Sequence, residues 1–283
     1  MMSPYTLPDH ALEAMLQDDT PCGDATTFAL GIGDQPGQLV FRARRNMVLC
    51  GSEEALRIGQ LRGSSLVGSI RESGSRLKTG EEILRLSGNA ASLHVVWKTA
   101  QTLMEYLSGI ASATADIVLA ARRANPDIGI ACTRKNFPGT KAAAIKAILA
   151  GGASPHRLSL SETLLIFAEH RAFLGNEAPR ATVQRLRRAW PERAIIVEVA
   201  DESEALCWQE AGADILQLEK MPPSTVNRLK GLISKSSQTR IAVAGGINSA
   251  NAEEYARAGA DILVTSAPYF APPRDVAVTL SAL

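Results

Sequence analysis

Hydrophobic and polar positions follow two different patterns along this chain. Up to about residue 110, short apolar runs that suit strands, such as residues 38–42, are mixed with stretches of helical periodicity, such as residues 92–107. From residue 128 onward, β-rich runs alternate regularly with amphipathic helical runs. The mixed part predicts an α+β domain, and the regular alternation predicts a parallel sheet covered by helices. The predicted strands of the second part are residues 128–132, 194–199, 214–219, 240–246 and 261–266, and its predicted helices are residues 140–151, 201–212, 222–235 and 248–259.

An internal repeat sharpens the prediction for the second part. The hexapeptide Ala-Gly-Ala-Asp-Ile-Leu occurs at residues 211–216 and again at residues 258–263. In each copy the glycine suits a left-handed helix C-cap, and the apolar run after the aspartate suits a buried strand. The repeat favours a (β/α) barrel over a doubly wound sheet, whose G-x-G-x-x-G fingerprint is missing. We therefore predict an α/β protein with an N-terminal domain over residues 1–110 and a barrel over residues 111–283, whose last residues pack back on the N-terminal domain.

Charge and composition narrow the class of partner. Among 283 residues, 46% are hydrophobic, and 30 Lys and Arg are balanced by 29 Asp and Glu, for a formal charge of +1. A chain of this size buries a sizeable core without disulfides or metals, and its even charge argues against nucleic acid or an anionic membrane surface as the main partner. Any cationic binding site must therefore be local, formed by a few basic residues that lie close together.

The cysteines and the apolar stretches bear on the compartment. The 4 cysteines form no C-x-x-C pair, so they signal neither a zinc site nor a disulfide framework. We find no signal peptide at the N-terminus and expect the apolar stretches to be too short and too interrupted to span a bilayer. The expected location is the cytoplasm.

Candidate chemistry lies at the predicted strand ends. In a (β/α) barrel the active site is built at the carboxyl ends of the strands, so the residues that close each apolar run are the candidates. They combine two cationic pairs, two carboxylates, a glycine turn and a serine. The candidate residues are Arg134, Lys135, His156, Arg157, Glu198, Glu219, Gly245, Gly246 and Ser266.

The cations and the glycine turn point to anion binding. An arginine can bind a carboxylate or phosphate through two parallel hydrogen bonds, whereas a lysine acts as a point charge. Arg134-Lys135 alone could be a solvated charge pair, but a second pair, His156-Arg157, follows another apparent strand. The turn Gly245-Gly246 leads from a strand into a helix, so backbone N–H groups and the positive end of the helix can approach a phosphate. Its alternative interpretation is a tight turn that needs glycine for its geometry.

The carboxylates point to a metal. Glu198 and Glu219 stand on strands that are otherwise apolar, where an ionised carboxylate is costly unless a cation faces it. Together they could hold Mg²⁺, directly or through water, and the metal would carry a diphosphate. The alternative is a structural ion pair with the neighbouring cations.

The motifs together resemble one known family. Thr133-Arg134-Lys135 with Pro138-Gly139, the Gly151-Gly152 turn before His156-Arg157, and Gly245-Gly246-Ile247 resemble the quinolinate phosphoribosyltransferases, also called nicotinate-nucleotide pyrophosphorylases or NadC proteins. The likeness covers nearly the whole chain. Within the family, Trp97-Lys98 and the stretch Phe167 to Arg171 resemble the ModD branch, which is associated with molybdenum transport.

The resemblance implies a fold, an assembly and a reaction. The fold would be an N-terminal α/β sandwich and an open C-terminal (β/α) barrel of the type II phosphoribosyltransferase kind, in a homodimer whose N-terminal domains each cover the partner's barrel mouth. The reaction would be attack of an anionic nitrogen heterocycle on phosphoribosyl pyrophosphate, with Mg²⁺ steadying the departing pyrophosphate.

The resemblance also implies residue roles. Substrate binding would fall to Lys98, Arg134, Lys135, His156 and Arg157, and catalysis to Lys135, Glu198 and Glu219. Glu198 and Glu219 would also face the ribose and the metal, and Gly245, Gly246 and Ser266 would hold the 5′-phosphate.

Departures from the family pattern concern the acceptor. Where the quinolinate enzymes have an arginine reaching across the dimer, this chain has Lys98, and where they have a lysine it has Phe167. Glu162 and Glu219 stand in place of aspartates, and Ser266 in place of a glycine. We therefore predict phosphoribosyl transfer to an acidic heterocycle other than quinolinate. The alternatives are a quinolinate phosphoribosyltransferase that decarboxylates its product, and a non-catalytic protein that binds a phosphate or oxyanion.

Overall fold

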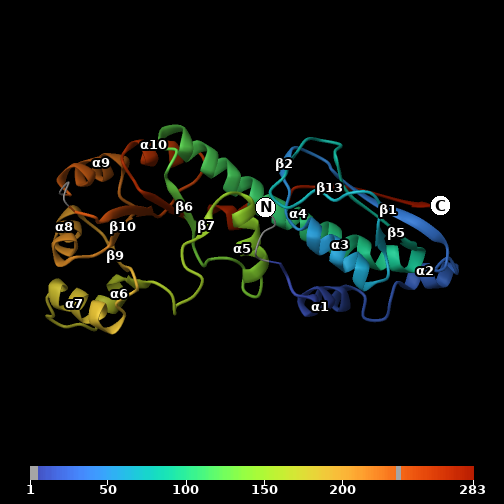
Figure 1. Cartoon of the computed structure of the whole chain (residues 1–283), viewed down its shortest axis with the longest axis horizontal. Helices are drawn as coiled ribbons and strands as arrows, with labels where there is room; N and C mark the ends of the chain where they lie inside the picture. The colour runs from blue at the N-terminus through green and yellow to red at the C-terminus, as the bar shows by residue number, and fades with distance from the viewer. Residues whose placement is uncertain (1–5, 234–236) are drawn as a thin grey trace. The chain divides into compact units, whose positions relative to one another are not determined.

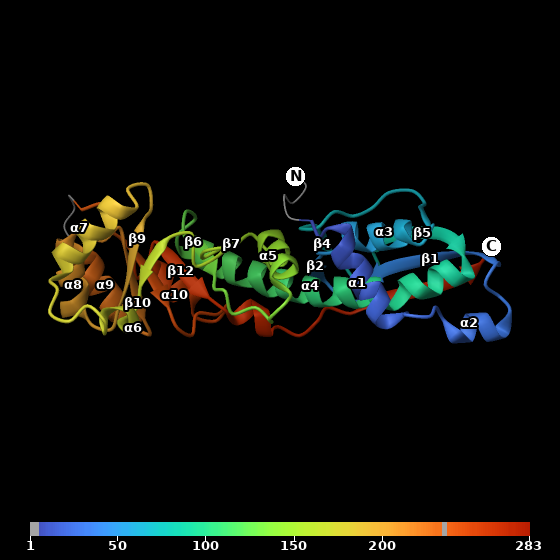
Figure 2. The same ribbon diagram turned by 90° about the horizontal axis from the view of Figure 1, so that it is seen from below.

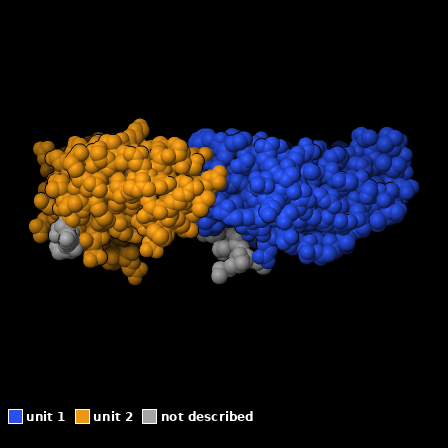
Figure 3. Space-filling view, turned by 90° about the horizontal axis from the view of Figure 1, so that it is seen from above, with its two compact units in different colours: residues 1–115, 136–152, 268–283 blue, residues 116–135, 153–267 orange. Residues whose placement is uncertain are grey.

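The computed structural model describes residues 6–233 and 237–283 (Figure 1). The chain forms two compact units that interleave along the sequence (Figure 3). Unit 1 consists of Met1–Ala115, Asn136–Gly152 and Pro268–Leu283, and unit 2 of Asp116–Lys135 and Ala153–Ala267. The prediction placed one domain boundary at residue 110, which lies inside helix α4 (Ala90–Ala124). The compact units are instead made of several segments each, so no one position in the sequence separates them.

Unit 1 is built on a four-stranded antiparallel sheet in the order β13-β1-β5-β3. Its strands are β1 (Pro36–Ala43), β3 (Ser65–Leu66), β5 (Glu82–Asn89) and β13 (Val276–Ala282), and a separate pair is formed by β2 (Met47–Val48) and β4 (Arg76–Leu77). In register, Leu39 faces Leu86 and Phe41 faces Leu84, and all four side chains are fully buried. Alternate residues of each strand thus place one apolar row on the core side of the sheet. Strand β13 pairs with β1 and brings the end of the chain back to this sheet, as predicted for the last residues.

Helices complete the core of unit 1 (Figure 2). They are α1 (Asp9–Asp19), α2 (Ala25–Leu30), α3 (Ser52–Leu61), α4 and α5 (Lys141–Ala150). In the first half of α4, Leu93, Val96, Ala100 and Met104 recur every three to four residues and are fully buried in the same apolar cluster as the sheet. The helix predicted over residues 92–107 is therefore real, and it continues well beyond the predicted end.

Helix α4 also corrects the expectation about apolar stretches. By length and composition, its 35 residues could cross a membrane, so the expectation that no stretch is long enough was wrong. In its most apolar window, however, 61% of the helix is buried within the structure. Such burial is typical of a core helix, because an apolar helix that packs on a sheet passes the same test of composition.

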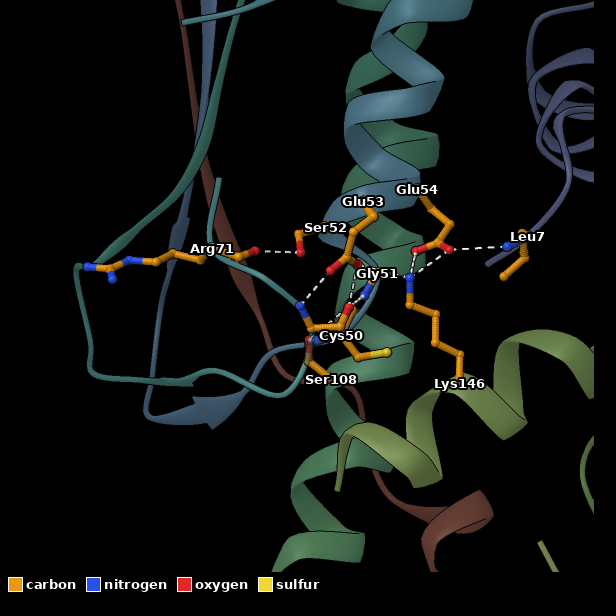
Figure 4. A network of polar contacts seen from close by, with 10 residues as sticks. Leu7, Cys50, Gly51, Ser52, Glu53, Glu54, Arg71, Ser108 and Lys146 are labelled. Atoms are coloured by element: carbon orange, nitrogen blue, oxygen red, sulfur yellow. Dashed lines mark hydrogen bonds and ion pairs between the residues drawn. The ribbon is translucent and has the colours of Figure 1, made fainter. Parts of the chain in front are cut away.

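A buried ion network ties α5 to α3 within unit 1 (Figure 4). The ammonium of Lys146 is completely buried and donates to Glu54 Oε2 at 2.6 Å and to Glu53 Oε2 at 2.9 Å. The backbone N–H of Leu7 donates to Glu54 Oε1, and both the N–H and the hydroxyl of Ser73 donate to Glu53. Burial alone would lower the pKa of Lys146, but its hydrogen bonds to Glu54 and Glu53 outweigh burial and raise it.

Unit 2 contains a seven-stranded parallel sheet in the order β7-β6-β12-β11-β10-β9-β8. The strands β7 and β8 form its two edges, so the sheet is an open barrel, as the resemblance implied. The strands are β6 (Gly129–Cys132), β7 (Ser154–Pro155), β8 (Leu164–Ile166), β9 (Ile195–Val199), β10 (Ile215–Glu219), β11 (Arg240–Ala244) and β12 (Ile262–Thr265). The connecting helices of unit 2 are α6 (Ala168–Arg171), α7 (Pro179–Ala189), α8 (Glu202–Ala211), α9 (Pro223–Leu232) and α10 (Ala252–Arg257). The 3₁₀ turn η1 (Ala267–Phe270) follows β12, where the chain passes from unit 2 to unit 1.

The two copies of the repeat form equivalent corners of unit 2. Gly212 and Gly259 have φ of 95° and 100°, which only glycine adopts without strain, and each ends a helix before a strand. Asp214 and Asp261 accept backbone N–H bonds from the neighbouring strands, at Ile195 and Ile241. Each aspartate thus helps to set the register of adjacent strands.

Two predicted helices are shorter than expected. The helix predicted over residues 222–235 is α9, which ends at Leu232, and residues 234 and 235 of that prediction lie outside the described residues. The helix predicted over residues 248–259 is α10, which begins only at Ala252. Asn248 and Asn251 account for the late start, because the amides of both side chains donate to the carbonyl of Gly246 and fix an irregular turn.

Candidate active site

A cavity of about 770 Å³ lies at the carboxyl ends of the strands of unit 2. Each strand contributes to it through residues within two positions of its carboxyl end or directly after that end. The lining includes Thr133, Arg134 and Lys135 after β6, His156 and Arg157 after β7, Phe167 after β8, Glu198 on β9, Gln217, Glu219 and Lys220 from β10, Gly245 and Gly246 after β11, and Thr265 and Ser266 from β12. All of the predicted site residues except Lys98 meet here.

Strand periodicity explains why these side chains converge. The interior of the sheet holds a small apolar cluster that includes Ala131, Ile196 and Val264. Successive residues of a strand point to opposite faces, so the residue two positions later returns to the interior. Two positions after those three residues come Thr133, Glu198 and Ser266, all of which line the cavity. The apolar residues close the bottom of the barrel, and the functional residues stand above them.

Lys98 is placed elsewhere. It lies on α4 in unit 1, exposed, and does not line this cavity. Its ammonium donates to Gln101 Oε1 at 3.3 Å and lies 4.6 Å from the centre of the Trp97 ring. Within a single chain, Lys98 is therefore not part of the cavity's cationic group.

The cationic wall is crowded. Arg157 is 9% exposed, and burial followed by the charge of Arg134 lowers its pKa, with Glu162 opposing. Burial, and then the charge of Arg157, lowers the pKa of His156 below 6.5, so its imidazole is neutral at neutral pH. Basic side chains that lower one another's pKa values are stabilised when an anion binds between them. This side of the cavity therefore suits a carboxylate or phosphate ligand.

An apolar side adjoins this wall. Leu160, Leu165 and Phe167 line the cavity, and the guanidinium carbon of Arg157 lies 5.8 Å from the centre of the Phe167 ring. The ring of Phe167 also stacks with that of His170 at 5.8 Å. The aromatic ring therefore stands where the resemblance places a lysine in the quinolinate enzymes, and it leaves this part of the cavity with one cation fewer.

The acidic pair lies opposite on neighbouring strands. Glu198 is in register with Gln217, whose Nε2 donates to Glu198 Oε2 at 2.7 Å. Burial raises the pKa of Glu198 above 4.5, and the charge of Glu219 raises it further, although the Gln217 hydrogen bond opposes both. Two carboxylates that repel each other in this way would be stabilised by a shared cation.

Gln217 and Lys220 line the cavity, and the sequence interpretation missed both. Gln217 is 4% exposed, and its Oε1 has no hydrogen-bond partner in the described part of the chain. An unsatisfied buried acceptor beside a carboxylate needs a ligand or water. The signal was present in the sequence, since Gln217 is a polar residue two positions before Glu219 on an otherwise apolar strand.

These oxygens suit Mg²⁺, which prefers carboxylate and carbonyl oxygen and keeps several waters. Glu198, Glu219 and Gln217 Oε1 offer only oxygen. Across residues 6–233 and 237–283, no group of three or more His, Cys, Asp or Glu is arranged to hold a metal. A metal held here would therefore depend on its own waters and on substrate oxygens as well as on these residues.

The glycine turn forms the remaining side. Gly245 and Gly246 have φ of 91° and 81°, a conformation that side chains rarely adopt. A Cβ on Gly245 would come within 2.5 Å of Lys220 Cγ, so there is no room for a side chain. Because α10 begins only at Ala252, a phosphate at this turn would meet the turn itself and not the end of a helix, which corrects the sequence interpretation.

Comparison with known protein families identifies this architecture. The family model of the quinolinate phosphoribosyl transferase C-terminal domain matches residues 110–279, and that of the N-terminal domain matches residues 24–108. The chain belongs to the quinolinate phosphoribosyltransferase family. It is accordingly a phosphoribosyltransferase, an enzyme of pentosyl transfer.

Individual relatives refine the placement. The chain is 45% identical over 255 residues to the ModD protein of Rhodobacter capsulatus, covering 90% of this chain and 98% of that protein. It is 32% identical over 258 residues to a protein of Methanothermobacter thermautotrophicus named as a nicotinate-nucleotide pyrophosphorylase, covering 89% and 91%. Among solved structures, NadC from Streptococcus pyogenes matches with a TM-score of 0.90 and 25% identity, covering 100% of this chain and 99% of that one. The relatives thus include both ModD and NadC proteins.

Proposed function

We propose that this enzyme transfers the phosphoribosyl group of phosphoribosyl pyrophosphate to a planar, anionic nitrogen heterocycle other than quinolinate, with Mg²⁺ as cofactor. The observation that carries the proposal is one cavity with a cationic wall, an acidic pair and a left-handed glycine turn on three sides. Those three features match the three parts of the reaction, which are an acidic acceptor, a ribosyl pyrophosphate and a 5′-phosphate.

The proposed reaction is a displacement at the anomeric carbon. The bond from C1′ to the pyrophosphate oxygen breaks, and pyrophosphate leaves with the bonding electrons. The lone pair of the heterocycle nitrogen then forms the new bond to C1′. Bound Mg²⁺ would supply charge neutralisation to the pyrophosphate.

The chain's own residues bind, orient and stabilise charge. Arg134, Lys135 and Arg157 hold the acceptor's anionic group and the pyrophosphate, and neutral His156 can donate or accept one hydrogen bond without adding charge. Glu198 and Glu219 face the ribose, where positive charge develops in the transition state, and Gln217 Oε1 can accept from a ribose hydroxyl or from water. Gly245, Gly246 and Ser266 surround the 5′-phosphate.

The acceptor is set by the apolar side of the cavity. Phe167 replaces a cation with an aromatic ring, which cannot pair with a second carboxylate but offers apolar contact to a flat ring. A quinolinate enzyme is the second candidate, because Arg134, Lys135, His156 and Arg157 are all present in the cavity. It predicts nicotinate mononucleotide and CO₂ from quinolinate.

The test is pyrophosphate release from phosphoribosyl pyrophosphate with a panel of aromatic acids, with and without Mg²⁺, followed by mass spectrometry of the nucleotide formed. We expect Mg²⁺-dependent release with a monocarboxylate and little with quinolinate. Turnover of quinolinate at about 1 s⁻¹ or more would instead establish the second candidate. Stabilisation by molybdate alone, with no turnover of any acid, would favour an oxyanion-binding protein and would give the ModD link to molybdenum a physical basis.

The proposal includes a homodimer. In the dimer that the resemblance implies, the partner subunit's Lys98 would complete the cationic wall, which accounts for its position outside the cavity of its own chain. A cytoplasmic location also belongs to the proposal, since Cys22, Cys50, Cys132 and Cys207 are all unpaired, as expected of a reducing compartment.

A further inference from the structure

Lys220 has an unusual backbone. Its φ is 55°, and it is the only residue other than glycine with positive φ across residues 6–233 and 237–283. A side chain in this left-handed region costs free energy, and Asn, Asp and Gly adopt it more readily than Lys does. Lys220 directly follows Glu219 at the end of β10 and lines the cavity. Such outliers cluster at functional sites, which makes Lys220 a candidate for a role of its own.

The strained corner is built jointly with the glycine turn. The N–H of Lys220 donates to the carbonyl of Ala244 at 2.8 Å, which fixes the end of β10 against the end of β11. The Cβ that Gly245 lacks would lie 2.5 Å from Lys220 Cγ and 3.1 Å from Glu219 Oε1. The stem of Lys220 therefore passes directly over Gly245, in space that only a glycine leaves open.

The ammonium of Lys220 is available to a ligand. Its nearest anionic partner is Glu219 Oε1 at 3.7 Å, which is too long for a hydrogen bond, and the Lys220 side chain is 78% exposed. An ion pair this loose and this exposed adds little stability, so it does not account for the strained backbone. A dianionic phosphate at the turn would instead give the three N–H donors of Lys220 a charged acceptor.

We propose that Lys220 binds the phosphate monoester of a sugar 5-phosphate held at the Gly245-Gly246 turn. The inference rests on the proposed function, because it assumes that phosphoribosyl pyrophosphate enters this cavity. It adds a fourth cationic group to Arg134, Lys135 and Arg157, and it stands at the end of β10, three strands from β6 in the order of the sheet. The left-handed backbone at Lys220 and the absent side chain at Gly245 act together to aim this cation at the turn.

The test is calorimetric titration of the full-length protein with ribose 5-phosphate in metal-free buffer. Lys220→Asn removes the charge and puts in a residue that favours the left-handed region, so we expect the fold and Tm to be kept while affinity falls about tenfold. Lys220→Arg keeps the charge and should stay within about threefold of the wild type. Lys78→Asn removes the same charge from an exposed turn of unit 1 and should bind as the wild type does.

The outcomes separate this inference from the proposed function. If the wild type binds ribose 5-phosphate and Lys220→Asn binds it equally well, the role of Lys220 is overturned and the proposed function stands. Weaker binding of pyrophosphate alone, with ribose 5-phosphate unaffected, would also overturn it, because Lys220 would then serve the leaving group. If the wild type binds neither ribose 5-phosphate nor phosphoribosyl pyrophosphate, both proposals fall.

Discussion

At the scale of single residues, the acidic pair is under electrostatic strain. Glu198 is half-buried beside Glu219, and its raised pKa shows that the ionised form is disfavoured in the folded protein. Such strain is useful where a cation or a developing positive charge is to be bound. Because of this strain, removing the charge of Glu198 should change the stability of the protein by a measurable amount.

Replacing Glu198 by glutamine should separate stability from catalysis. Glu198→Gln keeps the shape and an acceptor for Gln217 but removes the charge, so we expect a higher Tm at neutral pH, no added stabilisation by Mg²⁺, and a fall in kcat of about 100-fold. Scanning calorimetry with and without Mg²⁺ and steady-state kinetics measure these effects. Glu210→Gln, at an exposed position on α8, is the matched control and should change none of them.

The pH dependence of that difference follows from the raised pKa. Between 4.5 and its raised value, Glu198 holds a proton in the folded protein and has lost it in the unfolded chain, so this group's contribution to stability falls as pH rises. The Tm advantage of Glu198→Gln should therefore be largest at neutral pH and close as the pH falls toward 4.5. An advantage that stays constant with pH would contradict this explanation.

Phe167 is the second residue whose identity can be tested. Phe167→Lys returns a cation to the apolar side of the cavity, and we expect it to raise kcat/KM for quinolinate at least about tenfold relative to the preferred monocarboxylate. The matched control is Phe173→Lys, because Phe173 is 91% exposed and does not line the cavity. An unchanged ratio in Phe167→Lys would show that the acceptor is selected elsewhere.

At the scale of elements, helix α5 packs in unit 1 through Ala143 and Ala147 and through one buried charge, that of Lys146. Lys146 is completely buried, and its pairing with Glu54 is part of a network with Glu53 and the N–H of Leu7 (Figure 4). Buried pairs of this kind contribute little relative to apolar packing, but removing one partner leaves an uncompensated charge. The main effect of the network is therefore to fix the position of α5 on α3, and its net contribution to the free energy of unfolding is small.

Lys146→Met should cost about 3–5 kcal/mol of unfolding free energy, measured by urea titration. The double variant Lys146→Met with Glu54→Gln should recover part of this loss, because it also removes the stranded charge. Arg57→Met, which breaks an exposed ion pair with Asp9, is the control and should change little.

Burial raises the pKa of Glu53, but hydrogen bonds from Ser73 and Lys146 lower it overall. Its contribution to stability is thus present above pH 4.5 and is lost as pH falls through the lowered value.

At the scale of the whole molecule, the proposed homodimer builds each active site from two chains. Lys98 lies on unit 1, outside the cavity, and the other predicted site residues lie in unit 2. If the partner's Lys98 completes the cavity, Lys98→Ala and Lys135→Ala are each inactive alone. Their co-refolded equal mixture should regain about one quarter of wild-type activity, because half of the dimers are mixed and each has one intact site. An inactive mixture, or a monomer by light scattering, would refute the shared site.

Much of the fold followed from local patterns. The βα alternation after residue 128 and the repeated hexapeptide predicted a parallel sheet, because period-two apolar runs and left-handed glycines are local properties. The carboxyl-end rule then predicted that Arg134, Glu198 and Gly245 share one cavity, and they do. Patterning could not place the start of α10, since the side chains of Asn248 and Asn251 compete locally for the carbonyl of Gly246.

The sequence by itself determined which residues stand at strand ends, how charge is divided among them, and to which family they belong. The sequence also predicted that the last residues return to the first domain, but only the tertiary structure decided that β13 pairs with β1, that α5 packs in unit 1, and that Lys220 faces the cavity with a left-handed backbone. The physical reason is that strand periodicity and turn conformation depend on neighbouring residues. Pairing across more than 200 positions, a buried charge network and a left-handed lysine depend on contacts that exist only once the chain has folded.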